Sequence, residues 1–416
     1  MRMRRFFAIL LLAAAAVSLC GCGSIFDKEY VAESDYVFPQ SADNADEERI
    51  SVRNLAQLRQ VLLDLVSDGK TESSILFDTS YEGDVTEDMA SACWQVRSQD
   101  ALCAYCVKNI AYELSKIVSF YEARITVSYS DAVPSAEEIV KLPYSAGLTE
   151  LVEESLEQGN EQLVVLVGRS IYAAEDVEQI VIDSYEQCPA LAPQQPTVSV
   201  KMLSGTGMQR LYELNVNYGM DRDTLEERRK ELAALEPFPE ESLELDDAHK
   251  ALLAMEYLTE HCAWDGESRG DSVYAALIEG RANDKGMAFA YTELCRRLGL
   301  DTRIVHGQRD WQDYRWNLVK LDGSWYHADP SACLLEGMEA GFLLRDESIW
   351  ATHRWDTGAY PACTGELSYD ALRGGEAAEA ADGENAVQAV LQLEDDGAEA
   401  AESAAEPETA QTENKA

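Results

Sequence analysis

Basic residues are scarce in this chain of 416 residues. Lysine and arginine together number 34, against 76 aspartates and glutamates, and the formal net charge at pH 7 is −42. Such an acidic surface repels phosphate backbones and anionic lipid headgroups, so we expect no nucleic-acid partner. Apolar residues are plentiful by contrast: they make up 46% of the chain, enough to fill the cores of two ordinary domains.

The amino terminus lacks an apolar run long enough to span a bilayer. The apolar segment Phe6–Val17 is too short for that, and with three arginines before it the pattern is that of a secretory signal. The sequence Leu-Cys-Gly-Cys follows at residues 19–22 and resembles a bacterial lipobox. Cys22 follows a small glycine, so we expect removal of residues 1–21 and lipid attachment at Cys22. This would anchor the protein at the outer face of the bacterial cytoplasmic membrane; an ordinary signal peptide with a chance cysteine is the alternative.

Cysteine pairs at zinc-binding spacing are also missing. Cys103 and Cys106 form a C-x-x-C, but no second pair at finger-like spacing accompanies it, which argues against a zinc site. The motif lies in a helical pattern with no strand before it, which argues against a thioredoxin-like redox site. We expect buried thiols or a local disulfide here, and no cofactor in the chain.

The order of predicted elements favours an α+β fold between about residues 46 and 220. Periodicity predicts a long helix over 87–117, broken near Ser98. It also predicts helices at 55–65, 148–157 and 175–187, and strands at 74–77, 123–129, 162–167, 197–202 and 210–218. We detect neither an internal repeat nor a catalytic constellation in this region.

Composition marks the remaining segments. Residues 22–45 are polar and are predicted to be a tether. Residues 221–365 form the second predicted domain. Residues 366–416 are predicted to be a disordered acidic tail, because from Glu376 onward they are mostly alanine, glycine and acidic residues.

The second predicted domain contains the most informative stretch of the chain. Its sequence is EGRANDKGMAFAYTELCRRLGLDTRIVHG from Glu279 and, after a short connection, YRWNLVKLDGSWYHADP to Pro330. This resembles the core of the transglutaminase-like superfamily, whose motifs are G-x-C-x-G-Y-A, H-x-W-N and W-Y-x-x-D-P. The resemblance covers about residues 252–363. It implies a papain-like fold, in which a thiolate at the start of a buried helix attacks an amide carbonyl and a His-Asp pair from two strands assists.

Two of the three triad positions depart from the family. Asp284 stands at the position of the nucleophile and Tyr314 at that of the histidine, and only Asp329 matches. We expect Asp284 to cap the helix, which would stabilise it by about 0.5–2 kcal/mol over alanine, and to be a weak nucleophile. A phenol with a pKa of about 10 cannot deprotonate a thiol at neutral pH. We expect Asp329, without an imidazole to orient, to bond to Tyr314 and to backbone amides.

Three ring side chains are expected to line the former cleft, namely Trp316, Trp325 and His327. His327 precedes Asp329 by two residues, so the period of a strand puts both on one face. A displaced base, or a metal held by Asp284, His327 and Asp329, is therefore an alternative. We favour a packed structural histidine and expect no metal; the other histidines, His353 among them, show no ligand spacing.

Three functions remain open from the sequence. The favoured one is a lipid-anchored pseudoenzyme whose former cleft binds a peptide or another component of the cell envelope. The second is an active, thiol-dependent acyltransferase or peptidase with a displaced nucleophile such as Cys333. The third, suggested by the anchor alone, is a solute-binding lipoprotein, which would need two lobes of similar size around a hinge.

Overall fold

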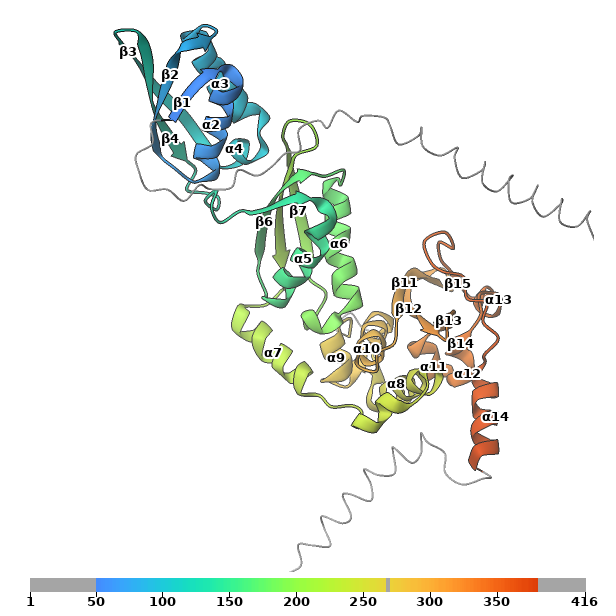
Figure 1. The fold of residues 1–416 in the computed structure, drawn as a ribbon. Coiled ribbons are helices and arrows are strands. Elements are labelled where there is room, and N and C mark those ends of the chain that lie inside the picture. Colours follow the sequence, from blue (N-terminus) through green and yellow to red (C-terminus); the bar gives the residue numbers. More distant parts are fainter. Residues whose placement is uncertain (1–49, 267–269, 381–416) are drawn as a thin grey trace, which may run out of the picture. The chain divides into compact units, whose positions relative to one another are not determined.

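The computed structural model describes residues 50–266 and 270–380 of the chain (Figure 1). The predicted signal peptide, the predicted lipidation site at Cys22 and the predicted tether lie outside the described residues. The described residues mix helices and strands, as predicted for an α+β fold. None of their helices is long and apolar enough to cross a membrane.

The first part of the described chain is a four-stranded sheet with helices. Its elements are β1 (Ile50–Asn54), α2 (Leu55–Ser67), β2 (Glu72–Glu82), α3 (Val85–Gln99), α4 (Ala101–Cys106), β3 (Val107–Ile117) and β4 (Phe120–Tyr129). The strand order is β1-β2-β4-β3; β1 and β2 are parallel and the other pairs are antiparallel. The helix predicted at 55–65 is confirmed as α2, whose first turn is capped by the Asn54 side chain accepting a hydrogen bond from Gln57 N (2.9 Å).

The long helix predicted over 87–117 is wrong in its second half. The break falls at Asp100, whose carboxylate accepts a hydrogen bond from Cys103 N (2.9 Å) and begins α4, and the chain then enters strand β3. Residues 112–117 include glutamate, leucine and lysine, which favour helix in isolation. Pairing of β3 with β4 along its whole length overrides that preference.

A second four-stranded sheet repeats the topology of the first (Figure 1). Its elements are β5 (Val140–Tyr144), α5 (Leu148–Glu157), β6 (Gln162–Arg169), α6 (Ala174–Gln187), β7 (Thr197–Ser204) and β8 (Arg210–Asn217), with short 3₁₀ turns η1 (Ser145–Gly147) and η2 (Pro189–Leu191). The order is β5-β6-β8-β7, again with the first pair parallel and the others antiparallel. Both parts thus follow a β-α-β-α-β-β order with the same pairing, which no sequence repeat had indicated.

The remaining elements build a helical layer against a five-stranded antiparallel sheet. The helical part contains α7 (Arg222–Ala234), η3 (Glu240–Glu244), α8 (Asp247–His261), α9 (Val273–Leu277), α10 (Asp284–Arg297) and the short pair β9 (Ala263–Trp264) and β10 (Arg281–Ala282). The sheet contains β11 (Thr302–Arg309), β12 (Gln312–Leu321), β13 (Ser324–Ala328), β14 (Phe342–Leu344) and β15 (His353–Arg354), in the order β14-β13-β12-β11-β15. Short helices connect and follow these strands: α11 (Pro330–Glu336), α12 (Met338–Gly341) and α13 (Asp346–Ile349).

Helix α10 is the centre of this part of the molecule, since it is buried continuously from Gly286 to Cys295. Asn317 on β12 fixes it to the sheet by donating hydrogen bonds from Nδ2 to Ala288 O (3.0 Å) and Thr292 Oγ1 (2.9 Å). At Gly286 a Cβ atom would lie 2.1 Å from Gly270 O, so this close approach requires glycine. Asn317 thus fixes the register of α10 against the sheet, and Gly286 allows the backbone at Gly270 to approach the helix.

The carboxyl-terminal part departs from the predicted disorder over residues 366–416. Helix α14 spans Tyr369–Ala380, and its Leu372 is buried. The Tyr369 ring lies 6.2 Å from that of Phe342, centroid to centroid. The chain therefore stays packed further than its composition indicated, because these two apolar side chains reach the core; the tail beyond residue 380 lies outside the described residues.

Candidate functional site

The start of α10 differs from the expectation for Asp284. The cap is Asn283, whose Oδ1 accepts hydrogen bonds from Lys285 N and Gly286 N (both 3.1 Å). Asp284 is the first helical residue, and its Oδ2 accepts a hydrogen bond from Arg315 N on β12 (2.8 Å). The carboxylate thus joins helix to sheet instead of capping the helix. Burial raises the pKa of Asp284, and the nearby Asp329 charge adds to the effect.

Tyr314 and Asp329 meet as predicted from their strands. The Tyr314 hydroxyl donates to Asp329 Oδ1 (2.9 Å) and Oδ2 (3.2 Å). Asp329 Oδ1 also accepts from Ala332 N (3.0 Å), which makes Asp329 the cap of α11. Burial and the Asp329 charge hold the pKa of Tyr314 well above its usual value. The phenol is therefore a fixed hydrogen-bond donor and does not ionise at neutral pH.

An imidazole also reaches Asp329, contrary to the sequence-based expectation. His353 Nε2 lies 3.2 Å from Asp329 Oδ2, and His353 Nδ1 lies 2.9 Å from Thr352 Oγ1. His353 belongs to β15, which pairs with the end of β11 through Arg309. Spacing along the chain gave no sign of this contact, because it depends on a strand pairing between residues more than forty positions apart.

Arg309 is a second residue of the site that sequence reasoning missed. Its guanidinium lies 3.6 Å from Asp329 Oδ2, donates to the Tyr314 hydroxyl (3.3 Å) and pairs with Glu336. Side-chain exposure rises from 4% at Asp329 through 15% at Arg309 to 52% at Glu336, so this ion pair lies on the solvent side of the Tyr314–Asp329 pair. The strand period of two from Val305 and Gly307 would have placed Arg309 on the face of β11 that meets this site.

Burial raises the pKa of all eight described thiols above the usual value. Cys333 is buried, and burial together with the Asp329 charge raises its pKa well above the usual value. Cys295, further along α10, is fully buried, and burial raises its pKa to about 12. Cys103 and Cys106 are free and buried, so the expected local disulfide is not formed and the alternative of buried thiols holds. A nucleophilic thiolate needs the opposite environment, exposed and close to positive charge.

Two of the three residues expected to line the cleft are buried instead. Trp316 is 0% exposed and His327 is 1% exposed, so neither faces a cleft. Both side chains pack against Trp355 in an aromatic cluster on one face of the sheet. Strand alternation directs them to this covered face and not toward a ligand. Trp325 is half-buried; Arg303 lies over its ring, 5.3 Å from the centroid, and both line a cavity of about 1300 Å³.

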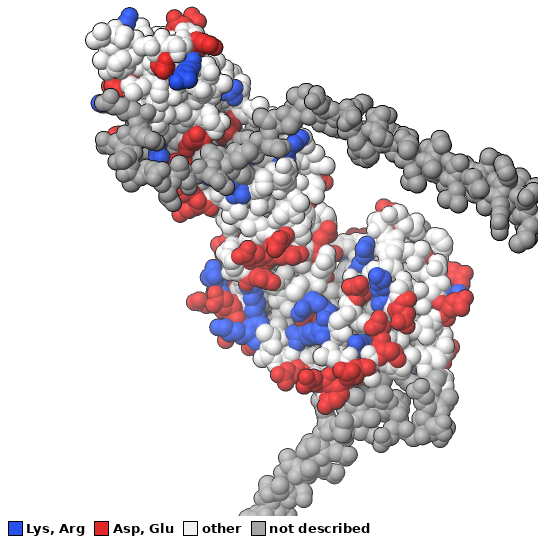
Figure 2. Space-filling model, in the orientation of Figure 1, with Lys and Arg blue, Asp and Glu red and all other residues white. Residues whose placement is uncertain are grey.

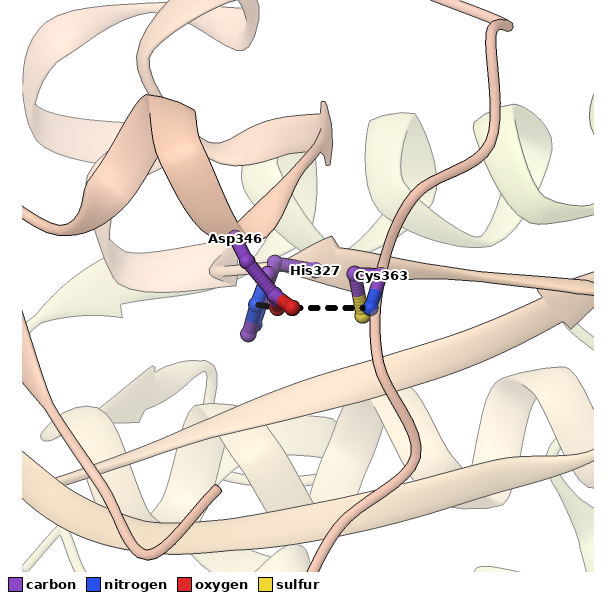
Figure 3. A group of neighbouring side chains, drawn as sticks. All are labelled: His327, Asp346 and Cys363. Carbon is purple, nitrogen blue, oxygen red and sulfur yellow. Dashed lines mark hydrogen bonds and ion pairs between the residues drawn. The ribbon is translucent and has the colours of Figure 1, made fainter.

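His327 is held in a hydrogen-bond network with Trp316 and Asp346. The alternative of a metal site required it to meet Asp284 and Asp329 instead. Trp316 Nε1 donates to His327 Nδ1 (2.9 Å), so the ring proton is on Nε2, which lies 2.9 Å from Asp346 Oδ1. Figure 3 shows Cys363 completing the group, and its backbone N donates to Asp346 Oδ2 (3.2 Å). The donor atoms of the three side chains lie within 4.8 Å of one another. Because Nε2 carries the proton in this arrangement, its lone pair is not free for a metal.

The cavity beside Trp325 has lining residues of both charges. Helix α6 contributes Asp183 and Glu186, and the sheet contributes Arg303 and Arg315. A contact from His306 Nε2 to Glu186 Oε1 (2.7 Å) joins the two elements. Figure 2 shows basic patches near α10 and β11 with acidic patches around them. A ligand with groups of both charges would match such a lining.

Residues 240–330 match the family model of the transglutaminase-like superfamily. Two solved structures are similar to the chain at 13% identity: a TGase, with a TM-score of 0.21 over 42% of this chain and 52% of that one, and a proposed cysteine protease from Cytophaga hutchinsonii, with a TM-score of 0.19 over 33% and 64%. The chain thus spans less than two thirds of either structure. No curated protein matches it. The matched segment contains Asp284, Tyr314 and Asp329, and the chain therefore has a transglutaminase-like domain over residues 240–330.

Proposed function

We propose that this protein is a catalytically inactive transglutaminase-like lipoprotein that binds a peptide or another cell-envelope component outside the cytoplasmic membrane. The observation on which the proposal rests is the position of Asp284. A carboxylate occupies the first residue of α10, where the family has its thiol, and already accepts the Arg315 N–H. Attack of a carboxylate on an amide would give an anhydride of high energy, so a carboxylate is a poor replacement for the thiol.

The acid–base partners are occupied as well. In a working triad one imidazole nitrogen faces the nucleophile while the other bonds to the carboxylate. Here one nitrogen of His353 faces Asp329 and the other faces Thr352 Oγ1, so neither faces a nucleophile. Tyr314 donates its proton to Asp329 and so cannot accept one from a thiol. These contacts disfavour the thiol-dependent alternative, which would also need the buried Cys333 to ionise.

The cavity beside Trp325 supports the binding part of the proposal. Its volume of about 1300 Å³ exceeds that of an ordinary small-molecule site and leaves room for several peptide residues. Arg303 forms no ion pair with any other described residue in a chain rich in acids, so its guanidinium is free to meet a ligand carboxylate. The solute-binding alternative is not favoured. It would need a cavity between two lobes of similar size, and residues 50–130 contribute nothing to the lining of this cavity.

Binding can be tested with the soluble chain that begins at Gly23. Equilibrium dialysis against a pool of tetrapeptides, each with one lysine and one glutamate, followed by mass spectrometry, would show which are retained. We expect retention that Arg303→Ala weakens at least tenfold and that Arg53→Ala, at an exposed site of the first sheet, leaves unchanged. No retention, or equal retention by the Arg303 variant, would overturn the peptide-binding proposal.

A further inference from the structure

The hairpin between β11 and β12 closes with a turn that is unusual for its residues. Arg309 pairs with Gln312, which leaves Asp310 and Trp311 as a two-residue loop. Both have positive φ, 49° and 67°, as a type I′ turn requires. Asparagine and glycine adopt this conformation readily, whereas the Cβ of a tryptophan meets the adjacent backbone there. Trp311 is therefore held in a strained backbone conformation.

Packing does not compensate for this strain. The Trp311 side chain is 75% exposed, so its large ring gains little from burial. Trp350, on the segment that leads into β15, is 53% exposed. Backbone strain is concentrated at functional positions in proteins, and large exposed apolar patches mark contact surfaces.

Arg354 contacts both the Trp311 ring and the backbone of Trp350. The Arg354 guanidinium carbon lies 5.4 Å from the centroid of the Trp311 ring, and Nη1 donates to the carbonyl oxygens of Trp350 and His353. Asp310 N donates to Thr352 O (3.0 Å), which ties the hairpin to the same segment. Figure 1 shows β15 beside β11. We name the exposed rings of Trp311 and Trp350 with the Arg354 guanidinium the aromatic platform.

The surroundings of the aromatic platform are polar. Asp310, Gln312 and Asp313 are exposed on the hairpin, and Thr352 and Asp356 are exposed on the facing segment. A protein partner that buried these rings in an apolar contact would leave the carboxylates without partners. The same carboxylates repel anionic lipid, and a second copy of a chain with net charge −42 is repelled as well.

We propose that the aromatic platform binds a neutral oligosaccharide. One face of a pyranose ring presents C–H groups, which carry partial positive charge and pack against the negative face of an indole ring. Its edge presents hydroxyl groups, which can donate to the carboxylates and can both donate to and accept from the Gln312 amide. Flat rings with a polar rim therefore match both parts of a sugar. Neither Trp311 nor Trp350 lines the cavity beside Trp325, so this site does not depend on the proposed peptide binding.

Titration calorimetry of the soluble chain from Gly23 against two neutral hexasaccharides, of N-acetylglucosamine and of glucose, tests the proposal. We expect one of them to bind, and Trp311→Ala and Trp350→Ala each to weaken binding at least tenfold. Trp94→Ala is the matched control, since Trp94 is 65% exposed on α3, far along the chain. Binding of neither sugar, an equal loss in the Trp94 variant, or binding to anionic vesicles in place of sugar would overturn it.

Trp311→Gly separates binding from folding. Glycine adopts the positive φ of this turn without strain, so we expect the thermal midpoint to stay the same or rise while sugar binding is lost. If the thermal midpoint falls, the ring is part of the packing and the proposal fails. If the sugar binds this variant as tightly as the native chain, the platform is not the binding site.

Discussion

Arg315 N donates a hydrogen bond to Asp284 Oδ2 over 2.8 Å, and this bond joins the start of α10 to β12. These are the two elements that, in the transglutaminase-like frame, hold the nucleophile and its base. The residue at the nucleophile position is thus used to close the interface between helix and sheet. Under the proposed function, a position that serves chemistry in the family serves structure in this chain.

Asp284→Ala should lower the free energy of unfolding by about 1–3 kcal/mol, because the Arg315 N–H would lose its acceptor in a half-buried place. Asp284→Asn keeps an acceptor oxygen and should recover most of the loss. Urea unfolding of the three proteins measures this difference. Equal stability of the alanine and asparagine variants would show that the hydrogen bond contributes nothing.

Arg309→Ala should destabilise the chain by about 1–3 kcal/mol, since the buried Asp329 carboxylate would lose its cation and Tyr314 would lose a donor. Glu336→Gln is the matched control. Its exposed ion pair with the same arginine should contribute less than about 1 kcal/mol. If the two variants unfold at the same urea concentration, the contacts of Arg309 with Asp329 and Tyr314 do not stabilise the chain.

The acid stability of the chain should depend on His327. Burial lowers its pKa, so between the ordinary value of about 6.5 and the lower folded value the unfolded chain binds a proton that the folded chain does not. Stability from this group is full above the unfolded pKa and falls as the pH drops through that window. His327→Gln keeps an acceptor for Trp316 Nε1 and a donor for Asp346 without titrating. The free energy of unfolding of this variant should fall less between pH 7 and pH 5 than that of the native chain. An identical fall in both proteins would contradict the lowered pKa of His327.

The folded chain should resist alkylation. Seven of the eight cysteines that follow Cys22 are buried, and burial raises the pKa of each of the eight. Iodoacetamide at pH 7.5 should therefore modify few sites in the native protein, the half-buried Cys188 first, and all eight in urea. Mass spectrometry of the two samples counts the adducts. Rapid native modification of Cys333 would revive the displaced nucleophile.

The lipid anchor is testable in cells. The full chain should take up labelled fatty acid and sediment with membranes, because Cys22 is the last residue of the lipobox-like sequence. Cys22→Ala should abolish both, whereas Cys20→Ala should abolish neither. Labelling of the Cys22 variant would place the modification at another residue, whereas an unlabelled native chain would favour the ordinary signal peptide.

The sequence predicts best those features that depend on neighbours along the chain. The helices α2, α5 and α6 were predicted within a few residues, because apolar periodicity is a local signal. The motif frame likewise brought Tyr314 to Asp329. These predictions needed no knowledge of which strand pairs with which.

What the sequence could not predict depends on contacts between distant segments. His353 reaches Asp329 only because β15 pairs with β11, and β3 is a strand only because β4 lies beside it. The two four-stranded sheets likewise share the same strand order and pairing, although no repeated sequence pattern accompanies it. Burial of Trp316 was missed for a related reason: the strand period gives the face of a side chain, not what covers that face.

The central claim is that the transglutaminase-like domain has no acyl-transfer activity. The most direct test incubates the soluble chain from Gly23 with a glutamine-containing peptide and a labelled primary amine, from about pH 5 to about pH 9, with and without an alkylating agent. Both amine incorporation and peptide hydrolysis are scored, beside an Asp329→Ala variant. We predict no turnover above buffer in any sample. Turnover in the native chain that alkylation abolishes would contradict the account and show that one of the buried thiols acts as the nucleophile.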